Sequence, residues 1–307
     1  MKAIFYKSLM VLSRRTGIWM FVFFSWVVAT GYFLFFPARV AVSVRFYRAL
    51  FPGKPRLYSL WCAWRQYHHF TYVFLDRFLL REDQELTQIS EGFDLLVEEV
   101  KKGKGAIVLM SHMGNWEVAA SRMKHKGMKV LLYVGKKYKE EIERMQKDTL
   151  EREGVRIVAM DQEGGSPFDI VEGIQFLREG GVVSMTGDRL WSAEQRAVAV
   201  RFLGHEALLP EGPHLFALLS GAPIFVFFVF RLGHNKYQTI MKPPRYVTAS
   251  SRAGRQEAIR ESAQWYAGLL EDMVRRHPCE WYHFEPFLKR NKKWLILLIY
   301  LTYPILR

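Results

Sequence analysis

The chain has 307 residues, of which half are hydrophobic and 15% aromatic, and its formal net charge is +14. This length is compatible with one large α/β domain plus a short appendage. The charge suits nucleic acid, an anionic membrane surface or acidic substrates. The sequence has no glycine-rich phosphate loop, zinc-ligand spacing or RNA-binding aromatic signature, so its Trp and Phe content and hydrophobic ends favour a membrane over nucleic acid.

Two cysteines, Cys62 and Cys279, have no metal-binding or redox spacing. We expect reduced thiols, a cytosolic setting for the soluble part, and no metal or cofactor.

The first predicted element is an uncharged apolar segment over residues 17–36. It is about as long as a helix needs to be to cross a hydrocarbon core, and Pro37 ends it. Basic residues flank both sides, so orientation is not fixed, and the segment either spans or lies as a deep in-plane anchor. No small-x-small cleavage site follows, which disfavours a signal peptide. Residues 1–55 are therefore predicted to be a membrane anchor region.

Residues 56–80 are predicted to form a long helix that is apolar nearly all round, and 88–102 an amphipathic surface helix. Strands then alternate with helices. The expected strands are 106–110, 128–134, 155–160 and 182–186, and the expected helices begin at 118 and cover 138–153 and 168–179. This alternation predicts an α/β fold, a mostly parallel mixed sheet flanked by helices.

The last third continues the pattern. We expect a strand over 197–204, a helix opened by 209–213, a buried strand over 224–230, an antiparallel edge strand over 236–242 and a helix over 252–276. Residues 56–290 would form the catalytic domain. The tail, 291–307, has a basic cluster and then an apolar run too short to span, which predicts an interfacial anchor.

The stretch Ser111–Glu117 follows a buried strand and precedes a helix. His112 therefore lies at the carboxyl end of a strand, where open α/β sheets place their chemistry. Gly114 permits a tight turn, and Asn115 is a good helix N-cap. Glu117 would lie in the first helical turn and face back toward His112. A histidine oriented by a carboxylate is a general base.

Two further strand or helix ends carry candidate site residues. Asp188 and Arg189 follow the strand over 182–186, and Arg189 suits a phosphate or carboxylate, or a local pair with Asp188. Glu211 and Gly212 open a helix, where they either leave backbone N–H groups for a ligand or simply cap it.

The stretch His112–Glu117 resembles the H-x-G-N-W-E form of the HX4(D/E) motif, which marks the lipid A biosynthesis (lauroyl/myristoyl) acyltransferases of the lysophospholipid acyltransferase superfamily. Later blocks are similar too, in the right order. They are the Asp at 188, the strand 200–204 (V-P-F-F-G in the family), the P-E-G at 210–212, the G-A-P at 221–223 and the E-W at 280–281. Arg189, where Gln is frequent, and Arg201 and Leu203 depart from the pattern.

The resemblance implies an acyltransferase that moves a fatty acyl chain from an acyl carrier protein or coenzyme A thioester to a hydroxyl of a lipid A-like or other lipid acceptor. It implies His112 and Glu117 as catalytic residues. Substrate contacts would come from the other candidates, Asn115, Asp188, Arg189, Glu211 and Gly212. The expected location is the bacterial inner membrane, with the catalytic domain on the cytoplasmic face, because either donor is cytosolic.

Two other functions stay open. A thioesterase or lipid hydrolase would use the same site with water in place of the acceptor. A non-enzymatic membrane adaptor or nucleic-acid binder would use charge and anchors alone, and it leaves the motif spacing unexplained.

Overall fold

The computed structural model describes residues 17–81, 87–135, 154–160, 167–192, 194–233 and 236–289. The helix predicted over 138–153 and the tail at 291–307 lie outside these ranges.

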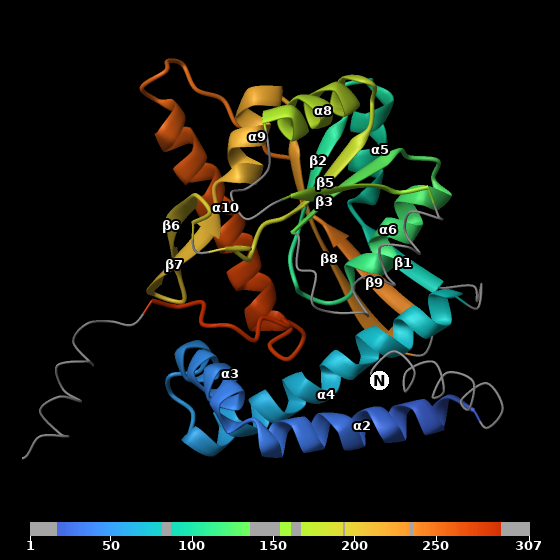
Figure 1. The fold of residues 1–307 in the computed structure, drawn as a ribbon, viewed down its shortest axis with the longest axis vertical. Coiled ribbons are helices and arrows are strands. Elements are labelled where there is room, and N and C mark those ends of the chain that lie inside the picture. Colours follow the sequence, from blue (N-terminus) through green and yellow to red (C-terminus); the bar gives the residue numbers. More distant parts are fainter. Residues whose placement is uncertain are drawn as a thin grey trace, which may run out of the picture.

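A seven-stranded sheet forms the centre of the molecule, in the order β1-β9-β8-β2-β5-β3-β4 (Figure 1). Neighbouring strands are parallel except β8 and β9, which are antiparallel. The strands are β1 Thr87–Glu91, β2 Ala106–Met110, β3 Val130–Gly135, β4 Arg156–Met160, β5 Val182–Thr186, β8 Ile224–Gly233 and β9 Lys236–Met241. The predicted fold class, a mostly parallel mixed sheet flanked by helices, is confirmed.

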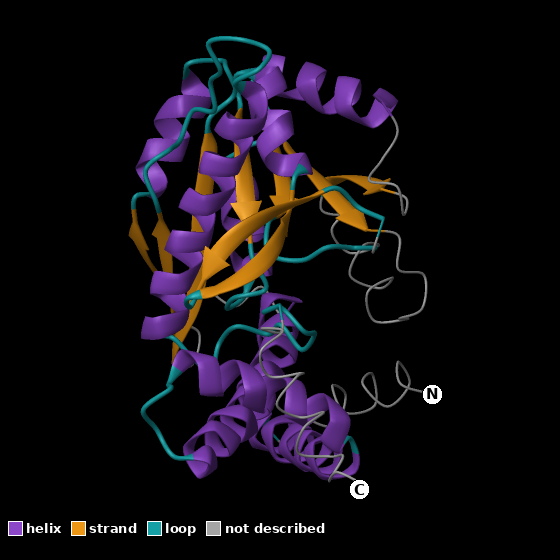
Figure 2. Ribbon diagram, turned by 90° about the vertical axis from the view of Figure 1, so that its left-hand side faces the viewer, coloured by secondary structure: helices purple, strands orange, loops and turns teal. Residues whose placement is uncertain are grey.

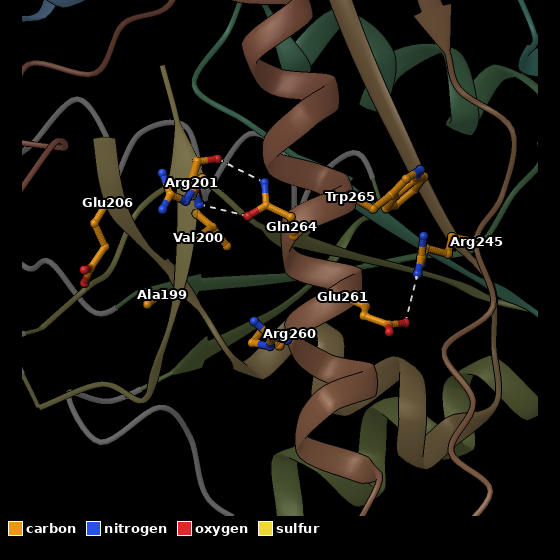
Figure 3. Close-up of a pocket in the computed structure, with 9 residues that line it drawn as sticks. All are labelled: Ala199, Val200, Arg201, Glu206, Arg245, Arg260, Glu261, Gln264 and Trp265. Carbon is orange, nitrogen blue, oxygen red and sulfur yellow. Dashed lines mark hydrogen bonds and ion pairs between the residues drawn. The ribbon is translucent and has the colours of Figure 1, made fainter. Parts of the chain in front are cut away.

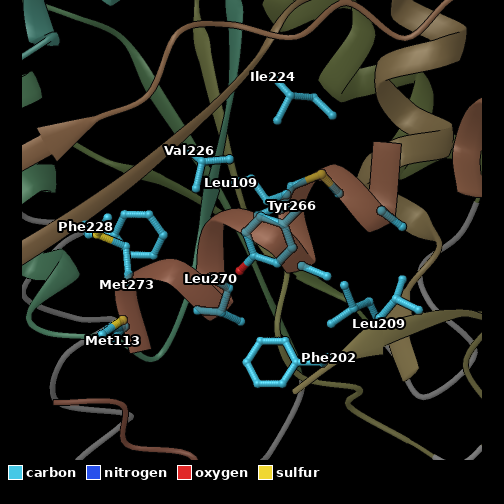
Figure 4. Close-up of a cluster of buried hydrophobic side chains, with 14 of the residues drawn as sticks. Leu109, Met113, Phe202, Leu209, Ile224, Val226, Phe228, Tyr266, Leu270 and Met273 are labelled. Atoms are coloured by element: carbon cyan, nitrogen blue, oxygen red, sulfur yellow. The ribbon is translucent and has the colours of Figure 1, made fainter. Parts of the chain in front are cut away.

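Helices cover both faces of this sheet. They are α5 Phe93–Lys101 and α6 Trp116–His125 on one face, and α8 Pro167–Arg178, α9 Gly212–Ser220 and α10 Arg255–Arg276 on the other. Alternate residues of β2 point to opposite faces. Val108 packs in the cluster with α5 and α6, whereas Leu109 packs with Tyr266 and Leu270 of α10 (Figure 4).

The predicted helix over 88–102 is partly wrong. Residues Thr87–Glu91 form β1, which pairs with β9, and only Phe93–Lys101 is helical. Gly92 separates the two with φ of 78°, a left-handed conformation that suits glycine. The strand predicted over 236–242 is antiparallel as expected, but it is not an edge strand, because β1 lies outside it.

A β-hairpin lies beside α10, and only its first strand is predicted from the sequence. Strand β6 Ala197–Phe202 was predicted, but its partner β7 His205–Pro210 was not. Leu203 and Gly204 form the two-residue turn with φ values of 51° and 75°, the positive values that tight hairpin turns require. Only the glycine of that pair is a typical turn residue, so the turn signal was weak.

The amino-terminal helices form a separate layer. Helices α2 Ile18–Phe35, α3 Pro37–Leu50 and α4 Arg56–Arg81 gather at one end of the sheet, and α4 lies between α2 and the sheet (Figures 1 and 2). Pro37 ends α2 as predicted and is the first residue of α3. By length and composition, α2 is the one helix in the described part of the chain that is able to cross a membrane, and only 11% of it is buried.

Candidate active site

The two neighbouring strands β2 and β5 bring His112 and Asp188 together. Their last residues, Met110 and Thr186, are paired in register. Both parallel strands therefore end at the same edge of the sheet, and the residues that follow them meet. The His112 Nδ1 atom lies 2.8 Å from Asp188 Oδ1, and the His112 backbone N–H donates to Asp188 Oδ2 at 2.8 Å.

Asp188 is completely buried and is ionised. The Trp281 indole N–H donates to Asp188 Oδ2 at 2.8 Å. Burial by itself raises the pKa of Asp188, but the charge and hydrogen bond of His112, the nearby His283 and the Trp281 hydrogen bond outweigh it and hold the pKa well below its usual range. A carboxylate accepts hydrogen bonds only, so the proton of the neutral His112 ring is on Nδ1 and its Nε2 carries a lone pair.

His112 remains accessible while its partner is not. Its side chain is 32% exposed, against 0% for Asp188. His112 can therefore accept a proton at Nε2 from a substrate group that reaches the exposed side of the ring. The buried Asp188 carboxylate stabilises the imidazolium that forms.

The turn after His112 depends on Gly114. Its φ is 67°, and a Cβ there would lie 1.8 Å from the Val229 carbonyl oxygen. The Gly114 N–H donates to the Glu280 carbonyl at 2.8 Å. The predicted N-cap is confirmed, because Asn115 Oδ1 accepts the backbone N–H of Glu117 at 3.1 Å.

The segment after α10 holds this turn from the other side. The Tyr282 N–H donates to the His112 carbonyl at 2.8 Å, and Met113 pairs with Trp281 in an antiparallel bridge. In the sequence, Trp281 stands out only as part of a block that resembles the family. A buried indole requires a partner for its N–H, which was the available signal for its contact with Asp188.

The carboxylate on His112 Nδ1 is that of Asp188, not that of Glu117. From the sequence, the orienting role is predicted for Glu117 and substrate binding for Asp188. Glu117 lies half-buried in the first turn of α6, as predicted. Spacing along the chain favoured Glu117, because Asp188 is 76 residues from His112 and reaches it only through strand pairing.

Arg189 lies beside this pair and does not form the local ion pair with Asp188. Its Nε is 3.6 Å from Glu285 Oε2, and it is buried without a hydrogen-bond partner. Its positive charge disfavours the protonated form of His283. Burial is the main cause that lowers the pKa of His283 to about 4, and Arg189 adds to it. Arg189 is thus a cation at the edge of the site.

Glu211 and Gly212 are not joined to the pair by any hydrogen bond among the described residues. Glu211 precedes α9, and its carbonyl accepts the N–H groups of His214 and Leu215 at 3.1 and 3.0 Å. Their role in binding stays a prediction.

His68 links two helices of the amino-terminal layer. Its Nε2 lies 3.1 Å from Thr30 Oγ1 of α2, and its Nδ1 lies 2.8 Å from the Trp64 carbonyl of α4. Within the described ranges, no three His, Cys, Asp or Glu side chains gather in a way that would hold a metal ion.

A cleft of about 690 Å³ lies between β6 and α10, away from these residues (Figure 3). Gln264 closes one side by bonding to both the N–H and the carbonyl of Arg201, at 2.8 and 3.0 Å. Arg245 lies 3.8 Å from Glu261, so part of the positive charge in the cleft is balanced. The cleft contains none of the residues predicted for the site.

The fold is that of an α/β protein in which a buried carboxylate orients an accessible histidine at the carboxyl ends of parallel strands. The sequence model of one protein family, described as bacterial lipid A biosynthesis acyltransferase, matches residues 72–290. The chain therefore belongs to this family, and it is an enzyme that transfers acyl groups. A comparison with curated proteins gives no match.

Proposed function

We propose that this enzyme transfers a fatty acyl chain from an acyl carrier protein or coenzyme A thioester to a hydroxyl of a lipid A-like or related lipid, with His112 as general base. The observation that carries the proposal is the 2.8 Å contact between His112 Nδ1 and the buried Asp188 carboxylate. It leaves Nε2 as the basic atom on an accessible ring.

The reaction proceeds by direct transfer. His112 Nε2 takes the proton of the acceptor hydroxyl, and the oxygen attacks the thioester carbonyl carbon and forms the new C–O bond. The tetrahedral intermediate then collapses, the C–S bond breaks, and the thiolate takes the proton from His112. Asp188 orients the ring and stabilises its charged form. General-base catalysis of this kind contributes roughly 10²–10⁴-fold.

The intermediate also needs a partner for its negative oxygen. The backbone N–H groups of His112, Gly114, Asn115 and Glu117 all have acceptors within the protein. These four groups are therefore not the donors that the intermediate needs. Arg189 is proposed to bind a phosphate or carboxylate of a substrate, and Glu117, Asn115, Glu211 and Gly212 are proposed to contribute to the site as the family resemblance implies.

The amino-terminal layer is proposed to seat the enzyme on the cytoplasmic face of the bacterial inner membrane. Two features support this. Helix α2 exposes large apolar side chains, among them Leu34 and Phe35, and helix α3 exposes Arg39, Arg45 and Arg48. Apolar and basic side chains together suit an anionic lipid surface.

The test is acyl transfer in membranes that carry the protein. Labelled acyl carrier protein and coenzyme A thioesters are incubated with a total lipid extract, and products are identified by mass spectrometry. We expect a labelled lipid with the wild type, and a loss of roughly 10²–10⁴-fold with His112→Ala. Asp188→Asn should also lower kcat strongly, because an amide cannot hold the imidazolium equally well.

Asp272→Asn is the matched control, because Asp272 forms an exposed pair with Arg276 on α10. Asp272→Asn should form the labelled lipid at the wild-type rate. Label that appears only as free fatty acid would assign the site to a hydrolase, and transfer that survives His112→Ala would exclude the proposed base.

A further inference from the structure

A second buried carboxylate lies next to the catalytic turn. Asp76 of α4 is 2% exposed and receives three hydrogen bonds from three other elements. Asn115 Nδ2 donates at 3.2 Å, Arg231 Nε at 3.0 Å and the Tyr237 hydroxyl at 2.5 Å. Burial raises the pKa of Asp76 above its usual value, and these partners offset the rise only in part. A buried carboxylate with this many donors holds each of them in place.

Asp76 determines which way the Asn115 amide faces. Because the NH₂ group points to Asp76, the Asn115 oxygen is free to cap the Glu117 N–H at 3.1 Å. The Asn115 backbone N–H is bound to the Val229 carbonyl at 2.9 Å. Asn115 is thus held at both side chain and backbone, three residues after His112.

Helix α4 also supports the other half of the catalytic pair. Gln66 Nε2 donates to the Trp281 carbonyl at 2.6 Å, and the Trp281 indole N–H donates to Asp188. One helix therefore contacts both the turn that carries His112 and the segment that holds Asp188. This helix lies directly above α2 in the layer with exposed apolar side chains (Figure 1).

We propose that Asp76 is a positioning residue for acyl transfer: through Asn115 it sets the position of the His112 turn relative to Asp188. The inference rests on the proposed function of His112. Asp76 does not touch the reacting atoms. It acts by keeping Nε2 within reach of the acceptor hydroxyl, and small displacements of a catalytic group lower rates sharply.

Asp76→Asn tests this. An Asn in this place presents an NH₂ group to neighbours that are themselves donors, so Asn115 must turn over and its oxygen leaves the Glu117 N–H. We expect kcat per folded enzyme to fall at least roughly tenfold and to change more than KM, because Asp76 itself touches no substrate and acts on the position of His112.

Tyr237→Phe is the matched control. It removes a hydrogen bond from the same buried carboxylate but leaves the Asn115 contact. It should lower the melting temperature as Asp76→Asn does and keep kcat within about twofold of wild type, since the turn is still held.

A double-mutant cycle separates positioning from folding. Asn115→Ser keeps an N-cap oxygen but cannot donate to Asp76. It should lower kcat as Asp76→Asn does, and the double variant should be no slower than the slower single variant.

The outcomes are distinguishable. If the wild type makes no His112-dependent lipid product, the proposed function fails. If the product forms and Asp76→Asn keeps wild-type kcat, loses kcat only as much as Tyr237→Phe, or adds fully to Asn115→Ser, then Asp76 has only a structural role.

Discussion

The charge on Asp188 depends on very few donors. Its Oδ1 faces the His112 ring, and its Oδ2 receives the His112 backbone N–H and the Trp281 indole N–H. With 0% exposure, the carboxylate has no water to replace a lost donor. Trp281 is therefore the one side chain, apart from His112 itself, that donates to Asp188 among the described residues.

Trp281→Phe should weaken the catalytic pair while keeping an aromatic ring in the core. Loss of a hydrogen bond to a buried charge costs about 1.5–3 kcal/mol. The pKa of Asp188 should rise, and the imidazolium of His112 should lose stabilisation. We expect kcat to fall roughly tenfold, measured by acyl transfer, with a lowered melting temperature.

Trp265→Phe is the control, because Trp265 packs partly buried beside the cleft and against Arg245 and makes no hydrogen bond to Asp188. It should leave kcat at the wild-type value. A Trp281→Phe enzyme that matches wild type in both kcat and melting temperature would contradict the importance of this hydrogen bond.

The sequence was enough to find His112 and the capping role of Asn115, because both follow from a local pattern of strand, turn and helix. It placed Asp188 at the end of another strand. It did not show that β2 and β5 are neighbours, so the orienting carboxylate was assigned to Glu117, which is near in the chain. The contact between Trp281 and Asp188 depends on the packing of a terminal segment, and no local pattern encodes it.

At the scale of elements, segments with a clear local pattern are predicted well from the sequence and segments without one are not. Strands β2 and β5 are buried apolar runs, and α4 and α10 are long, so their patterns were clear. Strand β1, Thr87–Glu91, has the same length as β2 and β5 but contains no apolar run, and it depends on pairing with β9, which is distant in the chain. Tertiary pairing, rather than local propensity, decides such a segment.

Helices α9 and α10 meet through a buried histidine. His214 Nδ1 lies 2.9 Å from Ser262 Oγ, and its Nε2 is buried without a hydrogen-bond partner. Burial, with a smaller contribution from Arg245, lowers the pKa of His214 to about 3. In the unfolded chain His214 becomes protonated near pH 6.5, whereas in the folded protein it becomes protonated only near pH 3.

This difference makes the packing of α9 on α10 sensitive to acid. Because the folded pKa lies below the unfolded value, the stabilisation is complete above about pH 6.5 and is lost as the pH falls toward 3. At pH 5 the loss from His214 is about 2 kcal/mol. Urea unfolding at pH 7 and pH 5 should show a drop in the free energy of unfolding, and the drop should be smaller by about this amount in His214→Gln.

His125→Gln, at an exposed position on α6, is the control and should show the wild-type drop. Should His214→Gln lose as much free energy of unfolding as the wild type between the two pH values, another group would have to carry the acid sensitivity.

At the scale of the whole molecule, the His112–Asp188 pair lies at the end of the sheet that faces the amino-terminal layer. Gln66 and Asp76 of α4 reach the site from one side of this layer. The layer also exposes large apolar side chains of α2 and α4, a set that we call the outer apolar patch: Trp19, Phe23, Leu34, Phe35 and Leu57. The same layer thus lies between the proposed lipid surface and the proposed base.

The outer apolar patch should bind lipid, and α2 should provide much of the affinity. Leu34 and Phe35 are 64% and 80% exposed. Transfer of each such side chain out of water is favourable by about 1.5–3 kcal/mol. The double variant Leu34→Glu with Phe35→Glu should therefore bind anionic phospholipid vesicles at least about tenfold more weakly in a co-sedimentation assay. Leu219→Glu changes an apolar residue of α9 that is 48% exposed and lies outside the patch, so it should bind as the wild type does.

Equal sedimentation of all three proteins would show that the membrane contact lies elsewhere. A loss confined to the α2 variant, with acyl transfer to a detergent-solubilised acceptor retained, would assign membrane seating to this layer and leave the chemistry to His112 and Asp188.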